Sequence, residues 1–158
     1  MRSFHRWLSS LGVGLLPGAQ GTYASVLVAA LAALWLVRGG GPLCGWPYGL
    51  LVAGATAVAL WSSHMALRLR VFGASPDPGA ITIDEAAGML LALWGISRMG
   101  WELVAALVLF RLFDILKPLG VDRLQRLPGA WGVVADDLLA GLYALAVWQL
   151  LAWLPTLL

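Results

Sequence analysis

Apolar residues fill most of this chain in long runs that lack the regularly spaced polar positions of a water-exposed helix or strand. An α-helix needs about 20 apolar residues to cross the hydrocarbon core of a bilayer. Glycines, prolines and charged residues interrupt the apolar runs and mark the turns between them. The pattern predicts an all-α, polytopic integral membrane bundle with about five hydrophobic segments, some of them short or re-entrant. The predicted segments cover residues 23–37, 48–67, 81–97, 101–116 and 138–154.

The composition supports a membrane domain. Of the 158 residues, 61% are hydrophobic and only 11% are charged. A soluble domain typically has about 45–50% apolar residues and about 25% charged residues. One membrane-embedded domain is therefore expected over residues 1–158, without a second domain or a long linker. The basic residues at the start precede a short, glycine-rich stretch, so we predict no signal peptide. The single cysteine, Cys44, excludes an internal disulfide.

The charges predict how the bundle is oriented. Seven cations fall on one side of five crossings, while only Arg38 and Arg98 fall on the other. By the positive-inside rule, the side with more cations faces the cytoplasm. The cations on that side are Arg2, Arg6, Arg68, Arg70, Lys117, Arg123 and Arg126.

Carboxylates gather on the same side, although they come from three separate segments. Adjacent acidic residues repel each other, so two such pairs at one membrane face suggest a bound cation. Oxygen ligands without a histidine or cysteine cluster favour Mg²⁺, with Mn²⁺ or Ca²⁺ as less favoured occupants. Solvated helix ends remain the simpler interpretation for residues 122–126. The candidate metal ligands are Asp84, Glu85, Asp136 and Asp137, with Asp114 nearby.

Two cations flank Asp114 near the end of the fourth segment. Arg111, Asp114 and Lys117 recur every third residue, which on an α-helix places them on one face about 120° wide, and Pro118 should end that helix. Metal-bound carboxylates beside arginine and lysine are suited to binding and polarising phosphate. The residues therefore predict a cytosolic, metal-dependent site for a phosphate-bearing ligand. A lipid phosphate fits best, because its head group lies at this depth.

A glycine- and proline-rich stretch, residues 12–25, precedes the first segment. Backbone N–H groups at the start of the following helix could hold an anion. The alternative is a helix cap in a membrane re-entry turn. Other routes to phosphate chemistry lack their motifs, because the chain has no Gly-x-x-x-x-Gly-Lys-Ser/Thr loop and no arginine six residues after Cys44.

Three blocks of the chain resemble the phosphatidylglycerophosphatase A family in order and spacing. They are residues 14–25, residues 81–89, and residues 110–118 with their continuation to 132–141. The Phe-Arg-x-x-Asp-x-x-Lys-Pro pattern followed by Asp-Asp-x-x-Ala-Gly is the most specific part. The resemblance implies a Mg²⁺-dependent enzyme of the bacterial inner membrane, with its active site facing the cytoplasm. Such an enzyme removes the terminal phosphate of phosphatidylglycerophosphate and leaves phosphatidylglycerol.

The family's motif positions map onto ten residues of this chain. The resemblance departs from the family at Gln20 and Ala24, where proline and glycine are usual. We expect the four carboxylates above to hold Mg²⁺, and Asp114 to be a further ligand or to activate the nucleophile. Arg111 and Lys117 would bind phosphate oxygens and stabilise the leaving group. The mapped residues are Gly21, Thr22, Ser25, Asp84, Glu85, Arg111, Asp114, Lys117, Asp136 and Asp137.

Other functions remain open at this stage. The nearest is a phosphatase that acts on another lipid or isoprenoid phosphate, because nothing in the residues fixes the glycerol head group. From a different class, a small cation or proton transporter would also use carboxylates, but it should place them at mid-membrane depth or on both sides. A purely structural membrane subunit would leave the two acidic pairs without a purpose.

Overall fold

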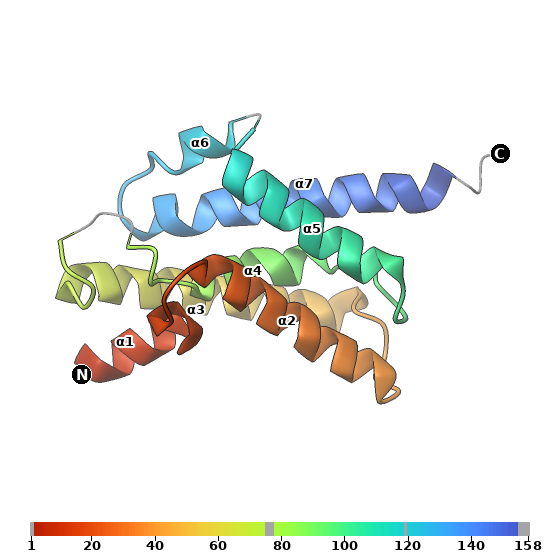
Figure 1. Ribbon diagram of the computed structural model, residues 1–158, viewed down its shortest axis with the longest axis horizontal. Helices are drawn as coiled ribbons and strands as arrows, with labels where there is room; N and C mark the ends of the chain where they lie inside the picture. Colours follow the sequence, from red (N-terminus) through yellow and green to blue (C-terminus); the bar gives the residue numbers. More distant parts are fainter. Residues whose placement is uncertain (1, 75–77, 119, 155–158) are drawn as a thin grey trace.

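Helices make up all the regular secondary structure in the part of the chain that the computed structural model describes, residues 2–74, 78–118 and 120–154. The all-α prediction is confirmed. In chain order the elements are α1 (Arg2–Ser10), the 3₁₀ turn η1 (Val13–Leu15), α2 (Gln20–Val37), α3 (Gly45–Leu69), α4 (Ile83–Ala92), α5 (Trp101–Leu116), α6 (Val121–Leu124) and α7 (Ala130–Trp153) (Figure 1).

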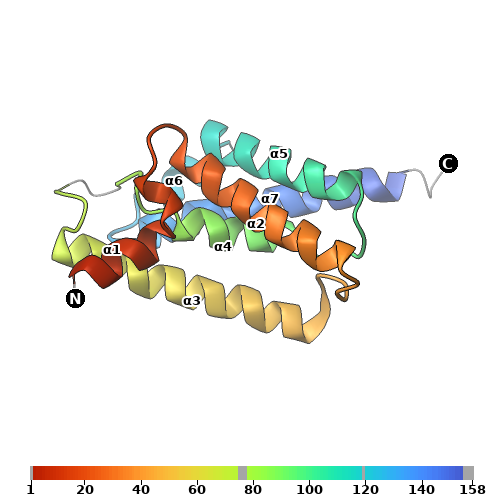
Figure 2. The same cartoon turned by 60° about the horizontal axis from the view of Figure 1, so that its bottom comes forward.

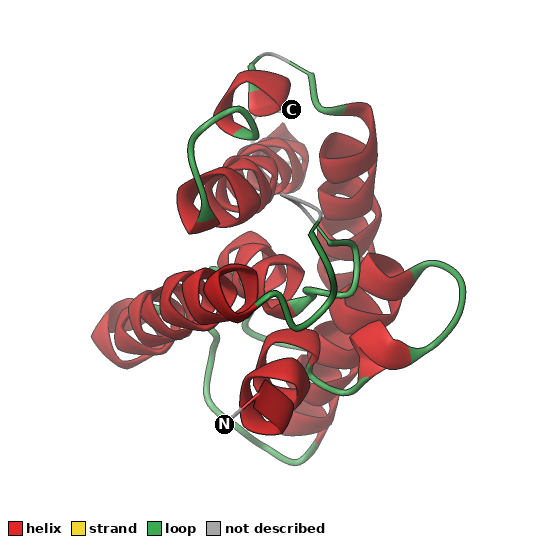
Figure 3. Cartoon of the chain, turned by 90° about the vertical axis from the view of Figure 1, so that its left-hand side faces the viewer, coloured by secondary structure: helices red, strands yellow, loops and turns green. Residues whose placement is uncertain are grey.

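The longer helices run back and forth between two ends of the bundle (Figures 1 and 2). One end carries α1, the connection from α3 to α4, and α6; we call it the charged end, and Figure 3 looks at the bundle from this side. Arg38 caps α2 at the opposite end, where Arg98 also precedes α5. The separation of charges predicted from the sequence is therefore present in the fold.

Three of the described helices, α2, α3 and α7, are long and apolar enough to cross a membrane. The predicted count of about five is not confirmed, because α5 has 16 residues and α4 only 10. Helix α4 is shorter than the predicted segment 81–97 because the chain turns at Gly95, which has a φ of 98°. Other helices surround α4, and Ala87, Met89 and Ala92 are buried. This short helix forms the centre of the bundle and does not cross a bilayer by itself.

Helices α4 and α7 touch through their backbones. A Cβ atom on Gly88 would lie 2.5 Å from the Asp137 carbonyl oxygen, and one on Gly141 would overlap the Gly88 carbonyl. Small residues permit this kind of close approach between membrane helices. Gly88 and Gly141 each follow an acidic pair by three to five residues, so the close crossing brings the two acidic pairs near each other.

Replacing Gly88 with alanine is expected to destabilise the bundle by about 1–3 kcal/mol, because the new methyl group overpacks against backbone that cannot rotate away. The measurement is thermal unfolding of the purified protein in detergent. Gly54→Ala is the matched control, since a Cβ there meets nothing within 4 Å and alanine favours the helix. Equal melting temperatures for the two variants would contradict the close crossing.

Two segment boundaries differ from the prediction in a way that matters for the site. Helix α5 begins and ends as predicted, but α2 starts at Gln20 and α7 at Ala130, before the predicted residues 23 and 138. The small and apolar residues 130–135 form helix because Gly129, with a φ of 64°, turns the chain just before them. Asp136 and Asp137 therefore lie inside α7 and not at its start.

Exposed tryptophans stand near both ends of α7. Trp131 and Trp153 are separated by about 33 Å along the helix axis and both are exposed. Tryptophan is enriched at the two membrane–water interfaces, and the hydrocarbon core between them is about 30 Å thick. The spacing suits a helix that crosses a bilayer with one tryptophan at each interface.

Candidate active site

Three carboxylates from two helices meet at the buried crossing of α4 and α7. Asp84 and Glu85 lie in the first turn of α4, and Asp137 lies on α7, where the Gly88 contact holds its backbone. One oxygen from each of the three residues lies within 4.8 Å of the others. Asp84 and Asp137 are only 5% and 4% exposed. This three-carboxylate group has the oxygen ligands that a hard divalent cation prefers.

The start of α4 does not use its own capping signal. Thr82, Asp84 and Glu85 match the Thr-x-x-Glu pattern in which the two end residues cap the helix reciprocally, yet Thr82 makes no side-chain cap. Its hydroxyl donates instead to the carbonyl of Ser10, at 2.7 Å. Glu85 is therefore available to the carboxylate group, and Thr82 is a supporting residue that our sequence analysis missed.

Burial makes negative charge costly in this group. It is the main cause that raises the pKa of Asp84 well above its ordinary value, and the neighbouring charge of Glu85 adds to the effect. The pKa of Glu85 rises to about 7, again mainly through burial, with a contribution from the charge of Asp114. A bound cation would offset this repulsion and keep the carboxylates ionised.

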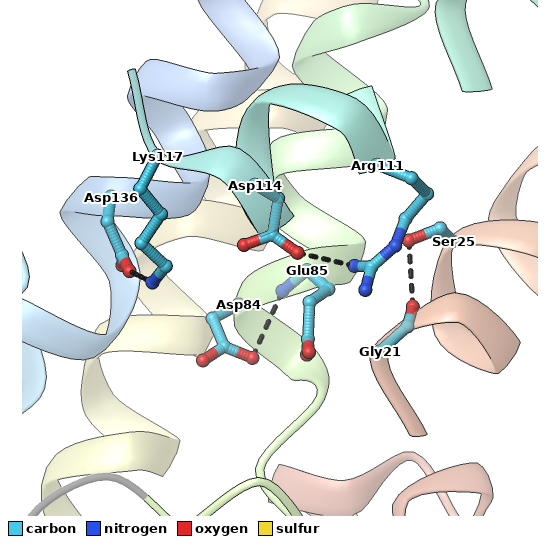
Figure 4. Close-up of polar contacts among 8 residues, drawn as sticks. All are labelled: Gly21, Ser25, Asp84, Glu85, Arg111, Asp114, Lys117 and Asp136. Atoms are coloured by element: carbon cyan, nitrogen blue, oxygen red, sulfur yellow. Dashed lines mark hydrogen bonds and ion pairs between the residues drawn. The ribbon is translucent and has the colours of Figure 1, made fainter. Parts of the chain in front are cut away.

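Two ion pairs lie beside the carboxylate group (Figure 4). Arg111 contacts Asp114 at 2.6 Å on α5. Lys117 contacts Asp136 of α7 at 2.5 Å. Burial by itself lowers the pKa of Lys117, but its hydrogen bond to Asp136 and the surrounding negative charge raise it overall.

Arg111 and Asp114 lie on α5 as expected, whereas Lys117 lies just beyond its end. Helix α5 ends at Leu116, and Lys117 caps it in a left-handed conformation with a φ of 47°. This conformation is unfavourable for a residue with a Cβ, and it takes Lys117 out of the helical register. The side chain instead reaches across to Asp136 on α7.

The first turns of α2 close the other side of the site (Figure 4). A Cβ on Gly21 would overlap Oε1 of Glu85 and lie 3.0 Å from Nη1 of Arg111, so only glycine fits here without displacing either group. The buried Ser25 hydroxyl donates to the Gly21 carbonyl at 2.8 Å. Thr22 is half-buried in the first turn, where backbone N–H groups lack acceptors within the helix.

Oε2 of Glu85 and Nε of Arg111 are buried polar atoms of the site that have no hydrogen-bond partner among the described residues. Buried polar groups are nearly always paired, so such atoms call for an explanation. The carboxylate oxygen can accept a cation, and the guanidinium can donate to an anion. A divalent cation beside a phosphate fits both of them.

Nine of the ten mapped residues lie on α2, α4, α5 and α7, and Lys117 directly follows α5; all ten surround one site, although they do not form a single group. Asp136, predicted as a metal ligand, pairs with Lys117 and is not one of the three carboxylates that converge. Asp114 pairs with Arg111.

Comparison with known proteins identifies the family of this chain. The family model described as phosphatidylglycerophosphatase A matches residues 7–152. The chain belongs to the phosphatidylglycerophosphatase A family. It is 33% identical over 149 residues to a putative phosphatidylinositol-3-phosphatase of Bacteroides thetaiotaomicron, covering 92% of this chain and 91% of that protein. It is also 40% identical over 73 residues to phosphatidylglycerophosphatase A of Haemophilus influenzae, covering 45% of each chain. No solved structure matches.

Membership of the phosphatidylglycerophosphatase A family assigns the reaction class. The protein is a phosphoric monoester hydrolase of the lipid phosphatase type, and its apolar helices are those of a membrane protein. The transporter and structural-subunit alternatives are set aside on this ground.

Proposed function

We propose that this protein hydrolyses the terminal phosphate of phosphatidylglycerophosphate in a Mg²⁺-dependent reaction at the cytoplasmic face of a bacterial inner membrane, releasing phosphatidylglycerol and inorganic phosphate. The observation that carries the proposal is the buried three-carboxylate group beside Arg111, with an unpartnered acceptor on Glu85 and an unpartnered donor on Arg111. The site can thus take a cation and a phosphate next to each other.

Asp84, Glu85 and Asp137 are the residues proposed to hold the metal ion. Mg²⁺ bound there would supply a Lewis acid that polarises the phosphoryl group. Asp136 was predicted in the same set, but its contact with Lys117 assigns it a different proposed role. Asp136 would hold the Lys117 ammonium at the edge of the site, where the ammonium can donate a hydrogen bond to a phosphate oxygen.

The phosphate itself would be bound by cations and by the start of α2. Arg111 donates to phosphate oxygens from buried nitrogen atoms, and Lys117 contributes a second positive charge. The backbone N–H groups of Gly21 and Thr22, in the first turn of α2, would add donors for the phosphate, because the N-terminus of a helix favours an anion. Ser25 keeps this first turn in place through its bond to the Gly21 carbonyl.

Asp114 is proposed to hold Arg111 and to accept a proton from the attacking water. The water oxygen bonds to phosphorus while the bond from phosphorus to the glycerol oxygen breaks. The glycerol oxygen takes a proton from solvent water, Asp114 returns its proton to solvent, and the phosphate leaves as inorganic phosphate. Arg111 and Lys117 stabilise the charge that develops in this step.

A head-group panel tests the proposal. The purified protein in detergent micelles is expected to release phosphate from phosphatidylglycerophosphate with Mg²⁺ present, and to lose this activity in EDTA and regain it when Mg²⁺ is restored. The panel also includes phosphatidic acid and a polyprenyl phosphate. Undiminished turnover in EDTA would contradict the metal assignment, and preference for another lipid phosphate would contradict the substrate.

Phosphatidylinositol 3-phosphate belongs in the same panel as the second candidate substrate. The relative named putative phosphatidylinositol-3-phosphatase covers nearly all of this chain. A higher kcat/KM for the phosphoinositide than for phosphatidylglycerophosphate would make it the better assignment.

A further inference from the structure

Helix α1 is folded against the bundle with its aromatic side outward. Phe4 and Trp7 are 59% and 61% exposed, whereas His5, Ser9 and Ser10 are buried. A helix on the surface of a water-soluble protein does the reverse, with its apolar stripe inward and its polar residues in solvent. The buried side packs on α3, where the His5 ring meets the Trp61 ring at 5.2 Å in an edge-to-face contact.

This arrangement suits a helix that lies in a membrane interface. Tryptophan and phenylalanine at that depth place their rings among the acyl chains and the head groups. Arg2 and Arg6 are also exposed, and the helix contains no acidic residue. Basic residues on such a helix are attracted to anionic lipids. The helix lies at the charged end of the bundle (Figure 2).

We propose that α1 is an interfacial helix that recognises an anionic phospholipid surface, with Phe4 and Trp7 inserted between lipids and Arg2 and Arg6 on the phosphate groups. The partner is a lipid bilayer and not another protein chain. A protein partner would have to match two arginines that alternate with two aromatic rings, whereas an anionic bilayer offers the charge and the apolar interior together.

Helix α1 is attached to the start of α4, which gives its position a role in the site. The Thr82 backbone N–H donates to the Ser9 carbonyl at 2.9 Å, and the Thr82 hydroxyl donates to the Ser10 carbonyl at 2.7 Å. Both bonds hold the residue that directly precedes Ile83 and Asp84. The depth of α1 in the interface thereby sets the depth of the acidic pair below the lipid head groups.

The test uses the full-length protein in vesicles. An environment-sensitive fluorophore is attached at Phe4→Cys in a Cys44→Ser background, and its quenching by lipids brominated on the acyl chain is measured. The vesicles contain phosphatidylcholine alone or with added phosphatidylserine. We expect the probe to be quenched, and more so with phosphatidylserine, because each arginine increases the equilibrium constant for the inserted position by up to about fivefold.

Removing the two charges is the decisive variant. Arg2→Gln with Arg6→Gln should abolish the effect of phosphatidylserine, while Arg38→Gln with Arg98→Gln, which removes the same charge from the opposite end, should retain it. A probe that is quenched equally in both kinds of vesicle, or not at all, would overturn the proposal. The experiment requires no turnover, so it can fail or succeed independently of the proposed phosphatase activity.

Discussion

Replacing Asp137 with asparagine is expected to lower metal-dependent phosphate release on the order of 10³-fold. The amide keeps the shape of the side chain but removes the charge that completes the three-carboxylate group with Asp84 and Glu85. A catalytic metal supplies several kcal/mol to the transition state, and about 4 kcal/mol corresponds to this factor. Two quantities are measured on the purified variant. The first is the initial rate at saturating Mg²⁺, and the second is the affinity for Mn²⁺.

Asp136→Asn is the matched control, because it changes the neighbouring carboxylate on the same helix. It should preserve Mn²⁺ affinity within a fewfold and raise the KM for the lipid phosphate, since Lys117 loses its partner. Equal loss of metal binding in the two variants would show that Asp136 is a ligand, as the sequence predicted. Full activity of Asp137→Asn would exclude the three-carboxylate group as the site of the catalytic metal ion.

Replacing Arg111 with glutamine should lower kcat/KM by about 10³-fold or more, as removal of a transition-state arginine does in other phosphoryl transfer enzymes. Arg111 has a buried nitrogen without a partner among the described residues and lies against Gly21 at the start of α2. Without Arg111, Lys117 is the cation that the described residues still place beside the site. The measurements are steady-state kinetics and inhibition by inorganic phosphate, which should weaken in parallel.

Arg123→Gln provides the charge control for this prediction, because Arg123 lies exposed on α6. Arg111→Lys tests the geometry, since lysine retains the charge but cannot donate two parallel hydrogen bonds. We expect the lysine variant to recover only part of the lost activity. If glutamine at position 111 had no more effect than glutamine at 123, Arg111 would not bind the phosphate.

The sequence predicted the helices and the place where charge gathers, because both depend on local patterns. Helix α5 was found at both ends, since Gly100 and Pro118 bound an apolar run. The acidic residues could be assigned to one end of the bundle from the alternation of segments alone. The close approach of α4 and α7 was also predictable, because Gly88 and Gly141 are small residues beside carboxylates.

The pairing inside the site could not be predicted in the same way. Which carboxylate faces which partner depends on how each helix is rotated, and a run that is apolar on all sides carries little information about rotation. Asp136 and Asp137 are equivalent in the sequence pattern. In the structure Asp136 contacts Lys117, whereas Asp137 lies with Asp84 and Glu85. The left-handed conformation of Lys117 was likewise not predictable from the residue type, because a residue with a Cβ disfavours it.

The tryptophans of α7 have a kinetic consequence. Asp137 lies about 9 Å along the helix from Trp131, on the bilayer side of that interfacial ring, so a phosphate in the proposed site is reached by lateral diffusion within the leaflet. The quantity that saturates such an enzyme is the mole fraction of substrate in the membrane surface. Adding inert lipid should therefore slow the reaction at a fixed bulk concentration of substrate, as two-dimensional dilution does.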